Sequence, residues 1–340
     1  MTTTELTDER LTEAVSVEPP VPSNGGLSQT IRGLLGFSRA LVAVFVVAQA
    51  SLAALFALGG IPTPFQVVLG FIAAFTGASA LIAYNDLLDV ELDRERLAQE
   101  QAAEAEVASA GSDGGAGTVL DIGALLIHHP VARGVISYRL GAAYIIVLSA
   151  ISMTATYLLQ PWLPLIYIGV IIFVTLYSRL ARRTPLKMLA VATAVTLGGV
   201  AGWMAVADPP YGEVFWLFAL WTFVWEIGGR NLPNDFNDIE EDHSLGIKTL
   251  PVVYGPVVAS RVSFVFLLLT VSVSVALVVA AGLPIWVALV SVGLGLYFLL
   301  EPGVRLLLAP EPSVSVRLYN RSAMYTPAML ALLAAGVLIA

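Results

Sequence analysis

The chain alternates between long apolar runs and short polar connections. A membrane-spanning helix needs about 17 to 25 mostly apolar residues. Nine runs meet or exceed this length, and they cover residues 36–59, 65–84, 138–159, 161–178, 186–207, 212–230, 251–281, 283–300 and 320–340. The seventh is long enough to begin with an interfacial turn near Pro251 and Gly255. The pattern predicts an all-α polytopic membrane protein with nine transmembrane helices.

Composition supports this prediction. Of the 340 residues, 57% are hydrophobic and only 12% are charged, which lies outside the range of soluble domains. The chain has no cysteine, so disulfides, thiolate metal sites and cysteine nucleophiles are excluded. The net charge of −8 comes from local clusters of acids and says little about partners, although an acidic surface is not expected to bind nucleic acid.

The basic residues predict the topology. All 17 Lys and Arg lie in the N-terminal segment, in alternate connections or at the adjoining helix ends, and therefore on one side of the membrane. By the positive-inside rule that side is cytoplasmic. We expect a cell membrane of bacterial type, with the N-terminus and both acidic motifs described below inside and the C-terminus outside.

Two segments differ in composition from the spans. Residues 1–28 are polar and acidic and are predicted to form a disordered cytoplasmic tail before the transmembrane domain of residues 29–340. Residues 94–127 are rich in Ala, Glu, Gln and Gly, which predicts a flexible cytoplasmic insertion whose first part extends the preceding helix. A lid is the alternative for this insertion, but its low complexity favours a simple loop.

Two nine-residue windows, 85–93 and 234–242, carry the same five polar residues at the same offsets. In each window an Asn and two Asp are spaced four residues apart, so on a helix their oxygens line one face over two turns. These residues are Asn85, Asp89 and Asp93 in the first window and Asn234, Asp238 and Asp242 in the second. Acids that merely end helices at the water interface are the simpler alternative, but the repetition favours a ligand site.

The chemistry of these side chains indicates the ligand. Carboxylate and amide oxygens, without Cys and with no His nearby, suit a hard cation such as Mg²⁺ better than zinc or copper. Magnesium usually binds few protein oxygens together with a phosphate. A doubled site therefore predicts several ions that bridge a diphosphate.

Three further stretches complete a family pattern. They are Gly246-Ile-Lys-Thr-Leu-Pro-Val-Val-Tyr-Gly255, Tyr177-Ser-Arg-Leu-Ala-Arg-Arg-Thr-Pro185 and Ala201-Gly-Trp203. With the two acidic motifs, the chain resembles the UbiA superfamily of intramembrane prenyltransferases over nearly all of residues 30–340, nearest to the chlorophyll-synthase and lipid-ether branches. It departs at His129, where many members carry Arg before Pro, and at Ala181, where a Lys is common.

The resemblance implies a nine-helix bundle with a lateral, lipid-facing cavity. It also implies Mg²⁺-dependent transfer of a prenyl group from a polyprenyl diphosphate to an aromatic or lipid-like acceptor. Asp89, Asp93, Asp238 and Asp242 would be catalytic, and together with Asn85 and Asn234 they would hold the metal. The residues expected to contact the diphosphate are Arg182, Arg183, Lys248, Arg94 and Tyr177.

Two alternatives differ in the reaction or in the class of protein. A terpene cyclase on the same scaffold would capture the prenyl cation with a double bond of its own chain, and the altered segment at His129 keeps this open. A transporter or channel also carries acids among apolar helices. Transport sites lie near the bilayer midplane, whereas these acids gather at the ends of spans, so transport is disfavoured.

Overall fold

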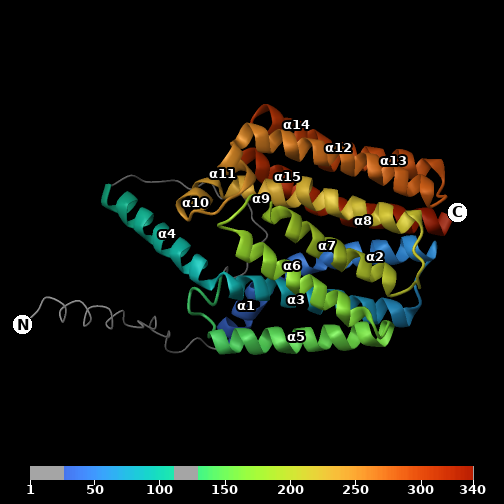
Figure 1. Ribbon diagram of the computed structural model, residues 1–340, viewed down its shortest axis with the longest axis horizontal. Helices are drawn as coiled ribbons and strands as arrows, with labels where there is room; N and C mark the ends of the chain where they lie inside the picture. Colours follow the sequence, from blue (N-terminus) through green and yellow to red (C-terminus); the bar gives the residue numbers. More distant parts are fainter. Residues whose placement is uncertain (1–26, 111–128, 340) are drawn as a thin grey trace, which may run out of the picture.

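The computed structural model describes residues 27–110 and 129–339, and every regular element in these ranges is a helix. Residues 1–26 of the predicted tail and residues 111–128 of the predicted insertion lie outside the described residues. The long helices run side by side along the longest axis of the molecule, as Figure 1 shows. The all-α prediction is confirmed.

The helices follow one another with short connections. In chain order they are α1 (Leu27–Phe37), α2 (Ala40–Leu58), α3 (Pro64–Leu88), α4 (Val90–Ala110), α5 (Tyr138–Leu159), α6 (Leu163–Leu180), α7 (Lys187–Met204), α8 (Glu213–Trp225), the π-helix η2 (Glu226–Asn231), α9 (Leu232–Asn237), α10 (Ile239–Ser244), α11 (Leu250–Tyr254), α12 (Pro256–Ala280), α13 (Ile285–Gly295), the π-helix η3 (Leu296–Leu300), α14 (Glu301–Leu308) and α15 (Pro312–Ile339).

Seven stretches of the described residues are long and apolar enough to cross a membrane: α3, α5, α6, α7, α12, the run from α13 to α14, and α15. An eighth candidate is the pair α1 and α2, bent by 42°. The predicted span at 212–230 is divided, because α8 has only 13 residues before η2 begins. The chain is an integral membrane protein, and the count of nine spans stays a prediction.

Local sequence signals explain where several helices begin and end. Thr63 and Gln66 form a capping box with Pro64 at the first turn of α3, and Ser137 caps α5. The long seventh run is interrupted at Gly255, whose φ of 84° favours glycine, so the expected turn separates α11 from α12. The last helix starts at Pro312, earlier than the predicted residue 320.

The two sides of the bundle are packed differently. Helices α8, α12, α13 and α15 enclose the larger core, in which stacked or tilted aromatic rings of Phe218, Trp221, Trp225 and Tyr325 follow one another. On the other side, α3 packs along α5 and α6 along α7, with α2 against both α3 and α7. This second side contains an apolar cavity.

Both acidic motifs lie at one end of the bundle. The first spans the end of α3 and the start of α4, and the second spans α9 and α10. In Figure 1, α4 extends away from the bundle at the end where α10 and α11 lie, and the C-terminus lies at the opposite end. The fold therefore brings together two segments that are far apart in the sequence.

Candidate active site

The middle Asp interrupts the helix in each motif. Asp89 follows α3 with φ −99° and ψ 10°, and Asp238 follows α9 with φ −109° and ψ 15°. Both values lie in the sparsely populated bridge region, which is common at active sites. The prediction of one continuous two-turn helix is therefore wrong for both motifs. Each motif instead consists of two helices that meet at the central carboxylate.

The first motif is held by neighbours on α3, α6 and the segment before α5. Asn85 donates to Asp89 (Nδ2 to Oδ2, 3.1 Å), and the hydroxyl of Ser178 donates to both residues. Asp93 is buried, and its Oδ2 lies 2.7 Å from Nδ1 of His129. His129, where the chain departs from the pattern it resembles, thus contacts the last acid of the motif.

The second motif repeats part of this arrangement with other partners. Asn234 donates to Asp238 (Nδ2 to Oδ2, 3.4 Å), as Asn85 does to Asp89. Asp242 is buried and lies 3.8 Å from the guanidinium of Arg96 on α4, which also forms an ion pair with Glu241. The last acid of each motif therefore faces a basic side chain from another element.

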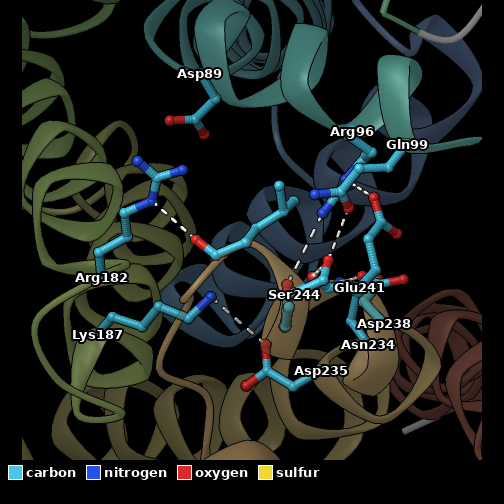
Figure 2. A network of polar contacts seen from close by, with 12 residues as sticks. Asp89, Arg96, Gln99, Arg182, Lys187, Asn234, Asp235, Asp238, Glu241 and Ser244 are labelled. Carbon is cyan, nitrogen blue, oxygen red and sulfur yellow. Dashed lines mark hydrogen bonds and ion pairs between the residues drawn. The ribbon is translucent and has the colours of Figure 1, made fainter.

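A buried lysine lies between the two motifs. Lys187, at the start of α7, is 5% exposed, and its Nζ lies 3.7 Å from Asp235 and 3.3 Å from the hydroxyl of Tyr177. The ammonium also sits 4.8 Å from the centre of the Tyr177 ring. Figure 2 shows Lys187 reaching toward Asp235. Asp235, next to the expected ligand face, is thus the partner of a fixed internal cation.

Helix α4 connects the first motif to the second. Besides the contacts of Arg96, Gln99 accepts a hydrogen bond from Ser244 at the end of α10 (2.8 Å). Glu95 accepts one from Arg182 (2.5 Å), and the same Arg182 donates from Nε to the carbonyl of Leu245 (3.0 Å). Figure 2 shows the contacts that Arg96, Gln99 and Arg182 make in this network. The first turns of α4 therefore have a structural role that a simple loop would lack.

Burial and mutual repulsion raise the pKa values of several acids of the site. Burial raises the pKa of Asp89 to about 6, and the neighbouring Asp93 carboxylate adds to the rise. Burial also raises the pKa of Asp242 to about 6, opposed by the charges of Lys187 and Arg96. Burial also raises the pKa of Asp238, and the charges of Arg96 and Lys187 limit this rise. Such crowded carboxylates favour a bound cation.

The donor atoms fit Mg²⁺ in chemistry, since Asn and Asp oxygens are the ligands that this ion prefers. Among the described residues, no three His, Asp or Glu side chains gather closely enough to hold one metal ion by themselves. The two motifs share the electrostatic influence of Lys187, which acts on Asp89 as well as on Asp238 and Asp242. The metal-ligand assignment stays a prediction.

The residues expected to contact diphosphate fall into two groups. Tyr177 lines the cavity and touches Lys187, and Arg182 contacts the loop after the second motif. The other three, Arg94, Arg183 and Lys248, are exposed, and the side chain of Arg182 is itself half-exposed. The backbone of Lys248 nevertheless joins its loop to α6, because its N–H donates to the carbonyl of Ala181 (2.7 Å).

An apolar cavity of about 600 Å³ opens beside the first motif. Asn85, Asp86, Arg39 and Tyr177 line it at the motif end, and most of the remaining lining comes from apolar residues of α2, α3, α5, α6 and α7. A few polar side chains, Ser51, Gln66, Ser152 and Thr156, also line it. Arg39 and Asp86 lie 3.5 Å apart as an ion pair. The arrangement can bind one molecule that has both a charged group and an apolar chain. A lateral opening to lipid stays a prediction.

Sequence reasoning missed Lys187, Arg96 and Arg39 as site residues. The sequence offered an indication for each of them, because a Lys or Arg that the fold buries beside an apolar span needs a polar or acidic partner. The positions of Lys187 after Thr184-Pro185 and of Arg39 within an apolar run could have indicated this. Arg96 carried a weaker signal, because it lies in a polar helix where exposed arginines are ordinary.

Comparisons with known proteins agree with this geometry. The model of the UbiA prenyltransferase family matches residues 121–324, more than half of the chain. A digeranylgeranylglyceryl phosphate synthase of Thermococcus sibiricus is 31% identical over 50% of this chain and 56% of its own length. One of Thermococcus kodakarensis is 24% identical over 73% of this chain and 74% of its own. The chain thus spans little more than half the length of the first of these relatives.

Solved structures share the fold. A UbiA homolog from Aeropyrum pernix K1 superposes with a TM-score of 0.63 at 20% identity, covering 87% of this chain and 97% of its own. A UbiA homolog from Archaeoglobus fulgidus, bound to DMAPP and Mg²⁺, superposes with a TM-score of 0.59 at 18% identity, covering 88% and 99%.

Proposed function

Because the chain belongs to the UbiA prenyltransferase family, we propose that it transfers a prenyl group from a polyprenyl diphosphate to a hydrophobic acceptor within the membrane. One observation carries the proposal. The cavity wall includes Asn85 and Asp86 of the first motif together with long apolar surfaces. A donor with its diphosphate at the motifs and its chain in the cavity matches this division of polar and apolar lining.

The metal belongs to this proposal. Asn85, Asp89, Asp93, Asn234, Asp238 and Asp242 would hold Mg²⁺. When bound, the ion neutralises the charge that develops on the departing diphosphate. The homolog bound to DMAPP and Mg²⁺ supports this assignment by analogy of fold.

The chain's own cations would orient the donor. Lys187 is fixed by Tyr177 and Asp235, so its charge is already in place before a ligand arrives, which is the condition for electrostatic preorganisation. Arg182 and Arg39 lie at the same end of the bundle and are half-exposed, so they can turn toward a diphosphate. The predicted roles of Arg94, Arg183 and Lys248 would require their exposed side chains to fold inward.

The apolar walls would protect the reaction. A prenyl cation formed beside the motifs would meet mostly apolar side chains of α2, α3 and α7 rather than water. Exclusion of water favours capture of the cation by an acceptor over hydrolysis. For the acceptor we propose a lipid-like molecule, a prenylated glyceryl phosphate, because two relatives are named digeranylgeranylglyceryl phosphate synthases. We further propose that the motif end faces the cytoplasm.

The test is a product analysis with the purified full chain in detergent or vesicles. Geranylgeranyl diphosphate and Mg²⁺ are supplied with geranylgeranylglyceryl phosphate, with an aromatic acid, or with no acceptor. We expect a doubly prenylated glyceryl phosphate in the first reaction. Prenylation of the aromatic acid alone would correct the acceptor class, and a cyclic hydrocarbon without acceptor would identify a terpene cyclase. Unchanged donor in all three reactions would contradict the proposal.

A further inference from the structure

The cavity is deep along the bundle axis. Asn85 lies at its polar end, whereas Gln66 and Pro62 line it near the opposite end of α3. Nineteen residues of helix separate Asn85 from Gln66, which corresponds to about 28 Å at the α-helical rise. A slot of this depth fits an extended chain better than a compact molecule.

Glycines in the cavity wall divide into two kinds. Gly77 and Gly202 are explained by close packing, because an added Cβ would lie 2.7 Å from Oγ of Ser152 at the first and would clash with the backbone of Ala50 at the second. Gly70 of α3 and Gly198 of α7 have no such neighbour, since a Cβ at either would meet no atom within 4 Å. Both have ordinary helical backbone within their helices.

Glycine is an unfavourable residue in the middle of a helix, so its presence at Gly70 and Gly198 is not explained by helix stability or by packing. Both positions line the cavity, and a side chain there would fill it. Free space around a glycine does not by itself show that it lines the cavity. A Cβ at Gly293 of α13 would also meet no atom within 4 Å, but Gly293 does not line the cavity. Gly293 therefore provides a matched control.

We propose that Gly70 and Gly198 keep the far half of the cavity open for a donor chain of four isoprene units. This inference rests on the proposed function, which places the diphosphate near Asn85. Four C–C bonds of about 1.5 Å advance an extended isoprene unit by roughly 5 Å, so four units reach about 20 Å. Fifteen residues separate Asn85 from Gly70, which is about 22 Å of helix.

Shorter chains would end before these positions. Gly198 lies eleven residues beyond Lys187, which is about 16 Å along α7 from the motif end. A chain of two units, about 10 Å long by the same bond lengths, stops short of both glycines. A chain of four units passes Gly198 and ends near Gly70. The two glycines therefore discriminate by chain length.

The experiment compares Gly70→Phe, Gly198→Phe and the milder Gly70→Leu with the control Gly293→Phe. The kcat/KM is measured for geranyl and geranylgeranyl diphosphate with one acceptor and Mg²⁺. In each cavity variant the ratio of the four-unit to the two-unit value should fall at least tenfold, with a smaller fall for Gly70→Leu. Gly293→Phe should keep the wild-type ratio.

A binding measurement separates this inference from the reaction. The melting temperature is recorded with geranyl or geranylgeranyl thiodiphosphate and Mg²⁺, because neither analogue requires turnover. If no donor reacts but the four-unit analogue stabilises the wild type more than the two-unit analogue, and Gly70→Phe removes the difference, the proposed reaction fails and the chain site stands. Equal stabilisation by both analogues in the wild type, or equal losses for both donors in folded variants, would overturn the inference.

Discussion

The two acidic motifs have the same spacing and different supports. In both, the central Asp interrupts the helix and accepts from the Asn four residues earlier, and the last Asp donates its N–H back to the carbonyl of the central one, at 2.8 Å in Asp93 and 2.7 Å in Asp242. The first Asp of each window differs most. Asp86 pairs with the half-exposed Arg39, whereas Asp235 pairs with the buried Lys187.

This difference assigns distinct tasks to equivalent positions. Under the proposed function, the backbone geometry shared by Asp89 and Asp238 would be the part that serves the ligand, because it is the same in both motifs. The contacts that differ, those of Asp86 and Asp235, fix each motif to its neighbouring helices. A buried pair such as Lys187 and Asp235 also supports the fold, since loss of one partner leaves a charge without compensation. Substitutions at equivalent positions should therefore have unequal effects.

The largest effect is expected at the shared position. Asp89→Ala or Asp238→Ala should lower kcat/KM at least about 100-fold, the scale seen when a preorganised stabiliser of developing charge is removed. Both side chains are partly exposed at the polar end of the bundle, so the variants should remain folded in the membrane. The measurement is prenyl transfer by purified variants. The exposed Glu91 and Glu240 occupy one matching offset in the two motifs, and their Ala variants are the controls.

Near-normal turnover of both Asp variants would contradict the metal-ligand assignment. Loss in only one would mean that the two motifs are not equivalent in the reaction, despite their common geometry. Either outcome is distinguishable from misfolding by the amount of monodisperse protein recovered in detergent.

The next effect separates Asp86 from Asp235 through their cations. Lys187→Met should destabilise the protein by about 3 kcal/mol, because Asp235 is then a buried carboxylate without its partner. Arg39→Met should cost less than 1 kcal/mol, since that pair is long and its Arg is half-exposed. Unfolding is followed in detergent by denaturant titration. The double variant Lys187→Met/Asp235→Leu should regain part of the loss, and no recovery would argue against the pair.

The sequence was informative about features that depend on local pattern. The positions of the apolar spans, the ends of α5 and the turn at Gly255 all follow from hydropathy and from Gly, Pro and Ser signals. The nearness of the motifs followed from their common side of the membrane. The break at Asp89 and Asp238 could not be predicted, because a bridge-region residue has no distinctive spacing. The partner of Lys187 depends on how the start of α7 lies relative to Asp235 of α9, which only tertiary structure defines.

A smaller effect concerns the link between the motifs through α4. Arg96→Gln should loosen α10, because the side chain would lose its ion pairs with Glu241 and Asp242. We expect amide exchange in residues 239–244 to become about tenfold faster, which corresponds to about 1.4 kcal/mol in the local opening equilibrium. Hydrogen exchange with mass spectrometry measures this. Arg94→Gln, at an exposed neighbouring position, is the control, and equal exchange in both variants would show that α4 does not restrain the second motif.

The smallest effect is a dependence of stability on pH in the protein without ligand. The folded-state pKa values of Asp89 and Asp242 are raised to about 6, from an ordinary value of 3.8. Between these limits the folded protein binds more protons than the unfolded chain. The free energy of unfolding should therefore rise as pH falls from 7 toward 5, by roughly 0.4 kcal/mol per group between pH 7 and pH 6.

The comparison of the motifs predicts how this slope divides. Asp89→Asn and Asp242→Asn should remove similar parts of it, because the two pKa values are alike although the neighbours that set them differ. The rest of the slope belongs to Asp235, whose pKa burial raises to about 7, and to Asp238, whose pKa burial also raises. Denaturant titrations at pH 5 to 7 measure the slope, with Glu91→Gln and Glu240→Gln as controls for exposed acids. A loss of stability on acidification over this range would contradict the raised folded-state pKa values of Asp89 and Asp242. It would mean that the cations around these two carboxylates fully offset the effect of burial on their pKa values.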